Sequence, residues 1–279
     1  MKLRMLGVTV LGAVGLAALP ACKEEQSAPV TGRASTPPPS APAPAAVKKA
    51  EAPAEAPAPE VGGGTVRGTV SFKGMPPAAA PVAPSEDPAC QGMALTDQSL
   101  QVKDGKLGNV LVRVRGLVPR SRPAKPAIID QQQCTYLPRV QGVAAGQPIL
   151  IKNSDGTLHN ARALAGAKTL FNVAQPPNGK AVERNLPAEA EVVRLKCDIH
   201  PWMVSWVVVN TNPYFATSGA DGSFSIEHLP AGSYTLEAWH ETLGTRTAEV
   251  SVKEGEATSV SFEFAATAQA KGSATGGMK

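Results

Sequence analysis

The segment from Cys197 to Met203, CDIHPWM, places a cysteine, a histidine and a methionine within seven positions. The whole chain of 279 residues has only four cysteines, four histidines and six methionines, so their grouping here points to chemistry. A thiolate with neutral imidazoles is a ligand set that selects copper or zinc, and a thioether as a weak further ligand favours copper. The segment therefore predicts a metal-binding loop with Cys197, His200 and Met203 as ligands.

A second imidazole is available in KNSDGTLHN, where His159 follows a turn 38 residues before Cys197. Two histidines, one cysteine and a distant axial methionine form the trigonal arrangement of blue-copper sites, in which similar geometry serves Cu(I) and Cu(II). Zinc ordinarily takes four firm ligands and makes little use of methionine. We therefore expect one type 1 copper ion per chain, with Met203 as its axial ligand.

Each of these residues also has an ordinary role open to it. The cysteine could be a buried thiol, the histidines turn or surface groups, and the methionine part of the core. Their occurrence together and in this order favours the metal site. A nucleophilic cysteine and histidine pair is the enzymatic alternative, but it needs an orienting third group and an oxyanion hole. The loop shows neither, so we do not expect an enzyme.

Strands must position these residues, because strand patterns dominate the sequence and helical patterns are nearly absent. Apolar residues alternate or run together between turn residues in segments such as TVRGTVSF, QPILIKNS, VVRLKC, SWVVVN and SYTLEAWH. One strand would end at Cys197 and fix its sulfur, while a turn containing Pro201 would fold the other ligands around it. Many short strands at regular spacing predict an all-β sandwich or barrel.

Two segments resemble the cupredoxin family of plastocyanin and amicyanin. In CTYLPRVQGVAAGQPILIKNSDGTLHN, residues 134–160, an aromatic residue and a proline lead into a strand, a glycine turn, a second strand and the pair His-Asn. LKCDIHPWMVSWVVV is similar to the amicyanin ligand loop, which is shorter than that of plastocyanin. The resemblance covers roughly residues 107–210. It implies a Greek-key sandwich with His159, Cys197 and His200 as equatorial ligands.

The resemblance also implies roles for neighbouring residues. Asn160 would tie the two ligand loops together by a hydrogen bond and donate towards the thiolate, which tunes the potential. Pro201 and Trp202 would form part of an apolar rim around the edge of His200, where electrons would enter. Two segments depart from the family: residues 165–190 form a long segment between the ligand loops, and residues 84–98 have no counterpart in the small carriers.

A second resemblance involves segments at both ends of the folded part. GTVRGTVSFKGMPP and DGSFSIEHLPAGSYTLEAWHETLG are similar to the opening and closing strands of the carboxypeptidase regulatory-like, transthyretin-like sandwich. Either the copper domain is inserted into this sandwich, which we favour, or two domains follow one another with a stray first strand. The predicted parts are a first strand region over 62–84, a cupredoxin domain over 85–211, a regulatory-like domain over 212–265 and a disordered tail over 266–279.

The amino terminus has the features of a bacterial lipoprotein signal. Two basic residues precede an apolar stretch ending at Leu19, which is too short for a comfortable membrane span. The following Pro-Ala-Cys completes a lipobox-like motif, so residues 1–21 would be removed and Cys22 lipidated. A plain signal peptide is the alternative. Residues 22–61, rich in alanine and proline, predict a disordered tether.

An exported chain meets oxidising conditions, so the two remaining cysteines, Cys90 and Cys134, are expected to form a disulfide. Two buried thiols are the alternative. His228 and His240 have no thiol near them in the sequence and are interpreted as structural or surface residues. The arginines near residue 115 are interpreted as a solvated face.

The net charge and the amino-terminal signal limit the possible functions of the protein. Without residues 1–21, 25 basic and 23 acidic residues remain, and this near neutrality gives no reason to expect nucleic acid as a partner. We expect a lipid-anchored electron carrier on the periplasmic side of the cell envelope, at the outer membrane because no aspartate follows Cys22. Its partner would be an exported redox protein such as a cytochrome c or a dehydrogenase. A copper-delivery protein and an envelope binding module with a structural copper site are the alternatives.

Overall fold

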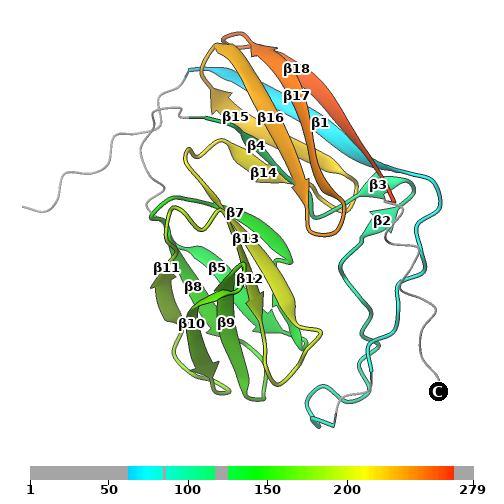
Figure 1. Ribbon diagram of the computed structural model, residues 1–279, viewed down its shortest axis with the longest axis vertical. Helices are drawn as coiled ribbons and strands as arrows, with labels where there is room; N and C mark the ends of the chain where they lie inside the picture. The colour runs from blue at the N-terminus through cyan, green and yellow to red at the C-terminus, as the bar shows by residue number, and fades with distance from the viewer. Residues whose placement is uncertain (1–61, 84–85, 117–124, 267–279) are drawn as a thin grey trace, which may run out of the picture. The chain divides into compact units, whose positions relative to one another are not determined.

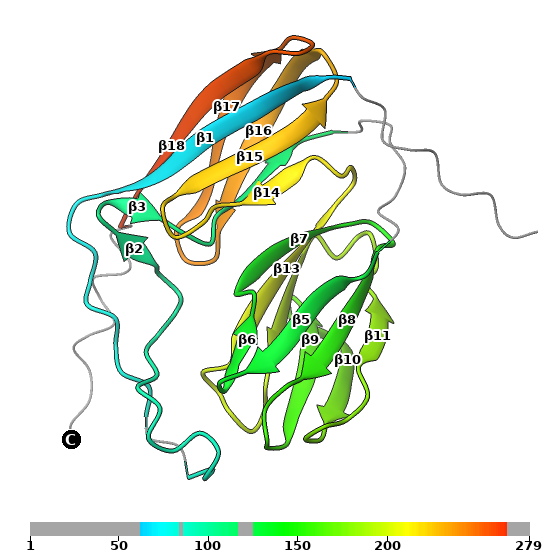
Figure 2. The ribbon, with the colours of Figure 1, turned by 180° about the vertical axis from the view of Figure 1, so that it is seen from behind.

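The computed structural model describes residues 62–83, 86–116 and 125–266 (Figures 1 and 2). Every helix or strand assigned in these residues is a β-strand, which confirms the predicted all-β class. Among them, no helix is long and apolar enough to span a membrane. The predicted signal peptide, Cys22, the tether and nearly all of the predicted tail lie outside the described residues.

One sandwich, which we call the terminal sandwich, takes its strands from both ends of the described chain (Figure 1). Its first sheet has the order β15 (Ser223–Leu229), β1 (Gly64–Lys73), β3 (Lys106–Leu107) and β2 (Val102–Lys103), and β18 (Ala257–Ala265) also pairs with β1. Its second sheet has the order β14 (Phe215–Thr217), β4 (Leu111–Val114), β16 (Gly232–His240) and β17 (Gly244–Val252). Strand β1 runs antiparallel to β15 and parallel to β18, so the beginning and end of this sandwich are hydrogen-bonded to each other.

The side chains of β1 explain its central place in the sheet. Val66, Val70 and Phe72 alternate along the strand and are buried in the core, as expected for a strand with one face inward. Gly68 takes the inward position between them, where an added Cβ would clash with the carbonyl oxygen of Val260. Glycine at this position therefore permits the close approach of β18.

A second sandwich, which we call the inserted sandwich, contains the remaining strands (Figure 2). One sheet has the order β10 (Lys168–Gln175), β9 (His159–Ala165), β12 (Val192–Lys196), β13 (Val204–Asn210) and β7 (Val140–Ala144). The other has the order β11 (Val182–Asn185), β8 (Pro148–Asn153), β5 (Ala127–Gln132) and β6 (Thr135–Leu137). The chain enters this sandwich after β4 and leaves it before β14, so its strands interrupt those of the terminal sandwich.

The core of the inserted sandwich lies between its two sheets. The side chains at its centre are fully buried: Ile129, Ile149, Ile151, Val193, Leu195 and Val207. Strand β13 is buried on both faces, because Val207 packs in this core while Val208 packs with Leu111 of β4. This explains why SWVVVN is a continuous apolar run rather than an alternating one.

The strand pairing shows that the predicted start of the cupredoxin domain, at residue 85, is wrong. Residues 102–114 fall within the predicted copper domain, which starts at residue 85, but they contain β2, β3 and β4 of the terminal sandwich. The sequence resemblance to cupredoxins, drawn from residue 107, likewise begins too early. An apolar alternating strand has the same pattern in either sandwich, so the sequence does not specify its partner.

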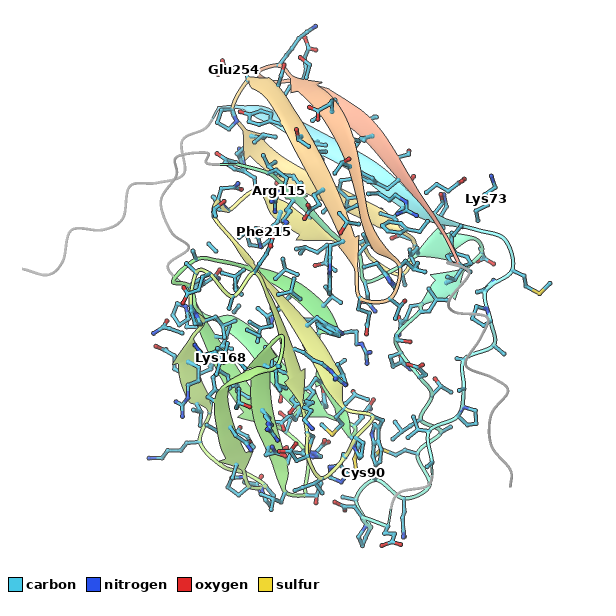
Figure 3. The ribbon with its side chains drawn as sticks, viewed as in Figure 1. Lys73, Cys90, Arg115, Lys168, Phe215 and Glu254 are labelled. Atoms are coloured by element: carbon cyan, nitrogen blue, oxygen red, sulfur yellow. A yellow bond between two sulfur atoms is a disulfide. The ribbon has the colours of Figure 1, made fainter. Side chains whose placement is uncertain are left out.

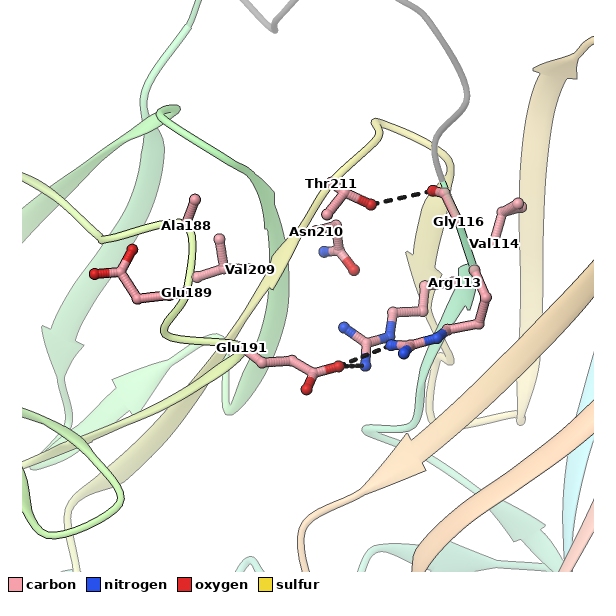
Figure 4. Close-up of a pocket in the computed structure, with 10 residues that line it drawn as sticks. Arg113, Val114, Gly116, Ala188, Glu189, Glu191, Val209, Asn210 and Thr211 are labelled. Atoms are coloured by element: carbon pink, nitrogen blue, oxygen red, sulfur yellow. Dashed lines mark hydrogen bonds and ion pairs between the residues drawn. The ribbon is translucent and has the colours of Figure 1, made fainter.

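Arg113 is buried, although the sequence predicts that it belongs to a solvated face of arginines. It is only 6% exposed, and its guanidinium binds Glu191 and Glu237. Arg115 also binds Glu191, with 2.8 Å between the guanidinium and carboxylate, and these two arginines hold the pKa of Glu191 below its usual range. Arg113, Arg115 and Glu191 line an open hollow, in which the two guanidinium groups face the Glu191 carboxylate (Figure 4).

Candidate metal centre

Three strand ends bring the predicted ligands to one end of the inserted sandwich. His159 is the first residue of β9, Cys197 follows the last residue of β12, and Met203 precedes the first residue of β13. Strand β12 pairs with both β9 and β13. The two ligand loops therefore lie side by side because their strands are neighbours in the sheet.

The loop between β12 and β13 is closed by its own backbone. The N–H of Cys197 donates to the carbonyl of Met203 at 3.2 Å, and the N–H of Met203 donates to the carbonyl of His200 at 2.9 Å. Cys197 and Met203 are both 1% exposed and belong to the apolar core of the sandwich. These two backbone bonds hold Cys197 and Met203 opposite each other at the base of the loop.

The donor atoms of His159, Cys197 and His200 all lie within 4.8 Å of one another. The two Nδ1 atoms are 2.9 Å apart, and the Cys197 sulfur lies 3.7 Å from Nδ1 of His200. These three side chains are at most 2% exposed. The structure thus brings together the three predicted equatorial ligands, with Nδ1 as the converging atom of each imidazole.

This donor set fits copper. The converging atoms are nitrogen and sulfur, and Met203 is buried in the same short loop; thiolate, imidazole and thioether together favour copper over metals that prefer oxygen. Burial lowers the pKa of His159, against the opposite effect of its bond to Asp155. A neutral imidazole is the form that binds a metal.

Asn160 links the two ligand loops as predicted, but it does not donate to the sulfur. Its Oδ1 atom accepts the backbone N–H of Asp198 at 2.7 Å and lies 3.3 Å from the Cys197 sulfur. Its Nδ2 atom donates to Asn172 and Asp198. The N–H of Asp198 needs an oxygen as its acceptor. This bond therefore fixes the orientation of the Asn160 side-chain amide, with Oδ1 towards the Cys197 sulfur.

The edge of His200 is covered, contrary to the prediction that it meets solvent. His200 is 2% exposed, and its Nε2 atom lies 3.1 Å from Asp87 and 3.8 Å from the Cys90 sulfur. Pro201 is exposed and Trp202 half-buried, with the Trp202 ring centroid 5.2 Å from that of His200. The covering residues belong to the segment without a counterpart in the small carriers, which is why the family pattern does not predict them.

A disulfide bond joins Cys90 to Cys134, with 5.9 Å between their Cα atoms. Cys90 lies within the segment that contacts the ligand loops (Figure 3). Cys134 directly precedes β6, and its carbonyl accepts the indole N–H of Trp202 at 2.9 Å. The disulfide therefore fastens the covering segment to the end of the sandwich that carries the site.

Two carboxylates at the site were not predicted. Asp155 lies 2.9 Å from Nε2 of His159, and Asp87 occupies the equivalent position on His200. The sequence signal for Asp155 is its place four residues before His159, in the turn that leads to this ligand. The other two histidines lie away from the site: His228 is exposed on β15, and His240 is buried at the end of β16.

Comparisons with known proteins involve both sandwiches. The family model of the carboxypeptidase regulatory-like domain matches residues 205–265, and no curated protein matches the chain. A purple cupredoxin from Nitrosopumilus maritimus is 25% identical with a TM-score of 0.27, covering 30% of this chain and 99% of its own. Amicyanin from Paracoccus versutus is 20% identical with a TM-score of 0.28, covering 36% of this chain and 97% of its own.

A copper-containing nitrite reductase from Thermus scotoductus is 15% identical with a TM-score of 0.28, and the match covers 35% of this chain and 25% of the reductase. Because these TM-scores are below 0.5, we base the metal site on this chain's own residues. The family match begins within β13 of the inserted sandwich and covers β14 to β18 of the terminal sandwich, whereas β1 to β4 of the terminal sandwich lie outside it. The family match agrees with the sequence resemblance of residues 221–244 to the carboxypeptidase regulatory-like sandwich.

Proposed function

We propose that the inserted sandwich binds one type 1 copper ion and passes single electrons between exported redox proteins. His159 and His200 would hold the ion through Nδ1, Cys197 through its thiolate and Met203 through its thioether. The convergence of two Nδ1 atoms and one sulfur in a buried site is the observation that supports this most directly. Copper bound in such a set supplies a one-electron couple.

The rigidity of the site suits electron transfer. Three of the proposed ligands are anchored by strand ends, and the loop that holds the other closes through backbone hydrogen bonds. Their burial keeps water and other small molecules away from the metal position. Little rearrangement between Cu(I) and Cu(II) is therefore needed, which is the property that a carrier requires.

Electrons would pass to the surface beside Trp202 rather than through an open His200 edge. Trp202 is half-buried and its ring lies next to that of His200. Its indole N–H is fixed by the carbonyl of Cys134, so the ring has a defined orientation. We propose a cytochrome c or an exported dehydrogenase as the partner that meets this surface.

The proposed location rests on the amino-terminal sequence. The lipobox-like motif ending at Cys22 supports a lipid anchor, and the alanine- and proline-rich residues after it would act as a spacer. We propose attachment on the periplasmic side of the outer membrane. Labelling of cells with a radioactive fatty acid tests the anchor, since Cys22→Ala should abolish incorporation.

Mixing the Cu(I)-loaded full-length chain with oxidised cytochrome c tests the electron-carrier proposal. We expect one equivalent of cytochrome to be reduced per chain while copper stays bound. The matched control is Cys197→Ser, which should reduce none. Rapid passage of copper to a Cu(I) chelator, without reduction of the cytochrome, would instead favour a delivery protein.

A further inference from the structure

Both histidines of the site have a carboxylate on the nitrogen that points away from the other donors. The Nε2 atom of His159 lies 2.9 Å from Oδ2 of Asp155, and that of His200 lies 3.1 Å from Oδ2 of Asp87. The two aspartate side chains are only 11% and 19% exposed. With Nδ1 facing the metal position, each imidazole can donate its Nε2 hydrogen to a carboxylate.

Asp155 is held by the backbone around it. Its carboxylate accepts the N–H of Gln133 at 2.6 Å and that of Cys134 at 2.9 Å. Its own N–H donates to Oδ1 of Asn153 at 3.0 Å. The same Oδ2 atom that accepts from Cys134 faces His159, so the position of this acceptor is set independently of the imidazole.

Asp87 is fixed in a similar way from a different part of the chain. The hydroxyl of Thr157 donates to its Oδ2 atom at 2.6 Å, and the N–H of Ala89 donates to Oδ1 at 2.9 Å. These two bonds hold the carboxylate of Asp87 in place as an acceptor beside His200.

The disulfide connects these two acceptors. Cys90 follows Asp87 by three residues, and Cys134 is the residue whose N–H binds Asp155. The bond between the two cysteines thus ties one acceptor to the other across the outer side of the site. The Cys90 sulfur also lies 3.8 Å from Nε2 of His200, which leaves little space for the ring to turn.

We propose that Asp87 and Asp155 are positioning residues that fix the two histidine rings and favour Cu(II) over Cu(I), which lowers the reduction potential of the site. This proposal rests on the proposed copper site and adds what sets its potential. A carboxylate that accepts the outer N–H of a ligand histidine makes the imidazole a stronger electron donor. Two negative charges near the metal position also attract Cu(II), with its higher charge, more strongly than Cu(I).

Voltammetry of the copper-loaded full-length chain tests the proposal with Asp87→Asn and Asp155→Asn. Asparagine keeps the size of the side chain and removes its charge. Loss of such outer contacts typically weakens metal binding by about 10- to 100-fold, and we expect the loss to affect Cu(II) more than Cu(I). Each tenfold fall in the affinity for Cu(II), relative to the affinity for Cu(I), raises a one-electron reduction potential by about 59 mV.

Asp198→Asn is the matched control. Asp198 lies next to Cys197, but its carboxylate binds Asn160, Asn172 and Lys196 rather than an imidazole. We expect Asp87→Asn and Asp155→Asn to raise the potential clearly more than this control, and Asp87→Glu to restore part of the change. Shifts no larger than that of the control would overturn the proposal while leaving the copper site intact. A wild-type chain without thiolate-bound copper would overturn the proposed function as well.

A second measurement uses only the wild-type chain and so covers the case of a variant that fails to fold. In nitrogen-15 NMR spectra of the chain loaded with diamagnetic Cu(I), which would occupy both Nδ1 atoms, His159 and His200 should each carry a hydrogen on Nε2 that exchanges slowly with water. Thermal unfolding identifies any variant that has lost its fold. If either Nε2 atom of the folded wild-type chain carries no hydrogen, the proposed donation to the aspartate is wrong.

Discussion

The side chain of His240 should make the stability of the terminal sandwich depend on pH. It is 1% exposed at the end of β16, and its Nε2 atom has no hydrogen-bond partner among the described residues. Its Nδ1 atom faces the N–H of Thr242 at 3.2 Å, so it acts as an acceptor. A second proton would have to be placed on an atom that already accepts a hydrogen, in a buried site near the positive charge of Arg139.

The size of the effect follows from the pKa. Burial, aided by Arg139, lowers the pKa of His240 from 6.5 to about 4. Because the folded pKa lies below the unfolded one, the stabilisation is complete above about pH 6.5 and is lost as the pH falls towards 4. The whole shift corresponds to about 3 kcal/mol, at about 1.4 kcal/mol per pH unit, and about 2 kcal/mol of it is lost between pH 7 and pH 5.

Urea unfolding at pH 7 and pH 5 measures this loss in the wild-type chain and in His240→Phe. Phenylalanine keeps a ring in the site but cannot be protonated, and comparing the two chains cancels the titration of all other groups. We expect the wild-type chain to lose about 2 kcal/mol more than the variant. Equal losses in both chains would show that His240 is not held neutral in the folded state.

Two further predictions concern the metal centre and the segment that covers it. Met203→Leu should keep copper and raise its potential, since the axial ligand is weak but favours Cu(II); loss of all copper, measured by metal analysis, would contradict an axial role. Replacing Cys90 and Cys134 together by alanine opens a cross-link between residues 44 positions apart. This should lower the free energy of unfolding by about 4 kcal/mol in the chain-entropy model. Unchanged urea midpoints would exclude a stabilising disulfide.

The part of the site that the sequence predicts is the part encoded locally. Cys197, His200 and Met203 lie in one short loop, and their types alone indicate the metal. His159 could be added because a strand pattern and the family resemblance both lead to it. That β9 and β12 are neighbours in one sheet is a matter of strand pairing, which side-chain patterns specify only weakly.

Contacts between distant segments account for what the sequence does not predict. Asp87 reaches His200 across 113 positions of the chain, and its segment has no counterpart in the family from which the ligands were inferred. The partners of β4 and the burial of Arg113 against Glu237 likewise depend on tertiary pairing. The orientation of the Asn160 amide follows from a single backbone N–H, which no sequence pattern specifies.

The visible absorption spectrum of the Cu(II)-loaded full-length chain tests the central claim most directly. Cys197 is the one free cysteine among the described residues and lies within reach of both imidazoles. We expect an intense blue band from thiolate-bound Cu(II) that bleaches with ascorbate, returns on oxidation and is absent from Cys197→Ser. A weak band typical of ordinary Cu(II) complexes, or a band that survives in Cys197→Ser, would contradict the copper site described above.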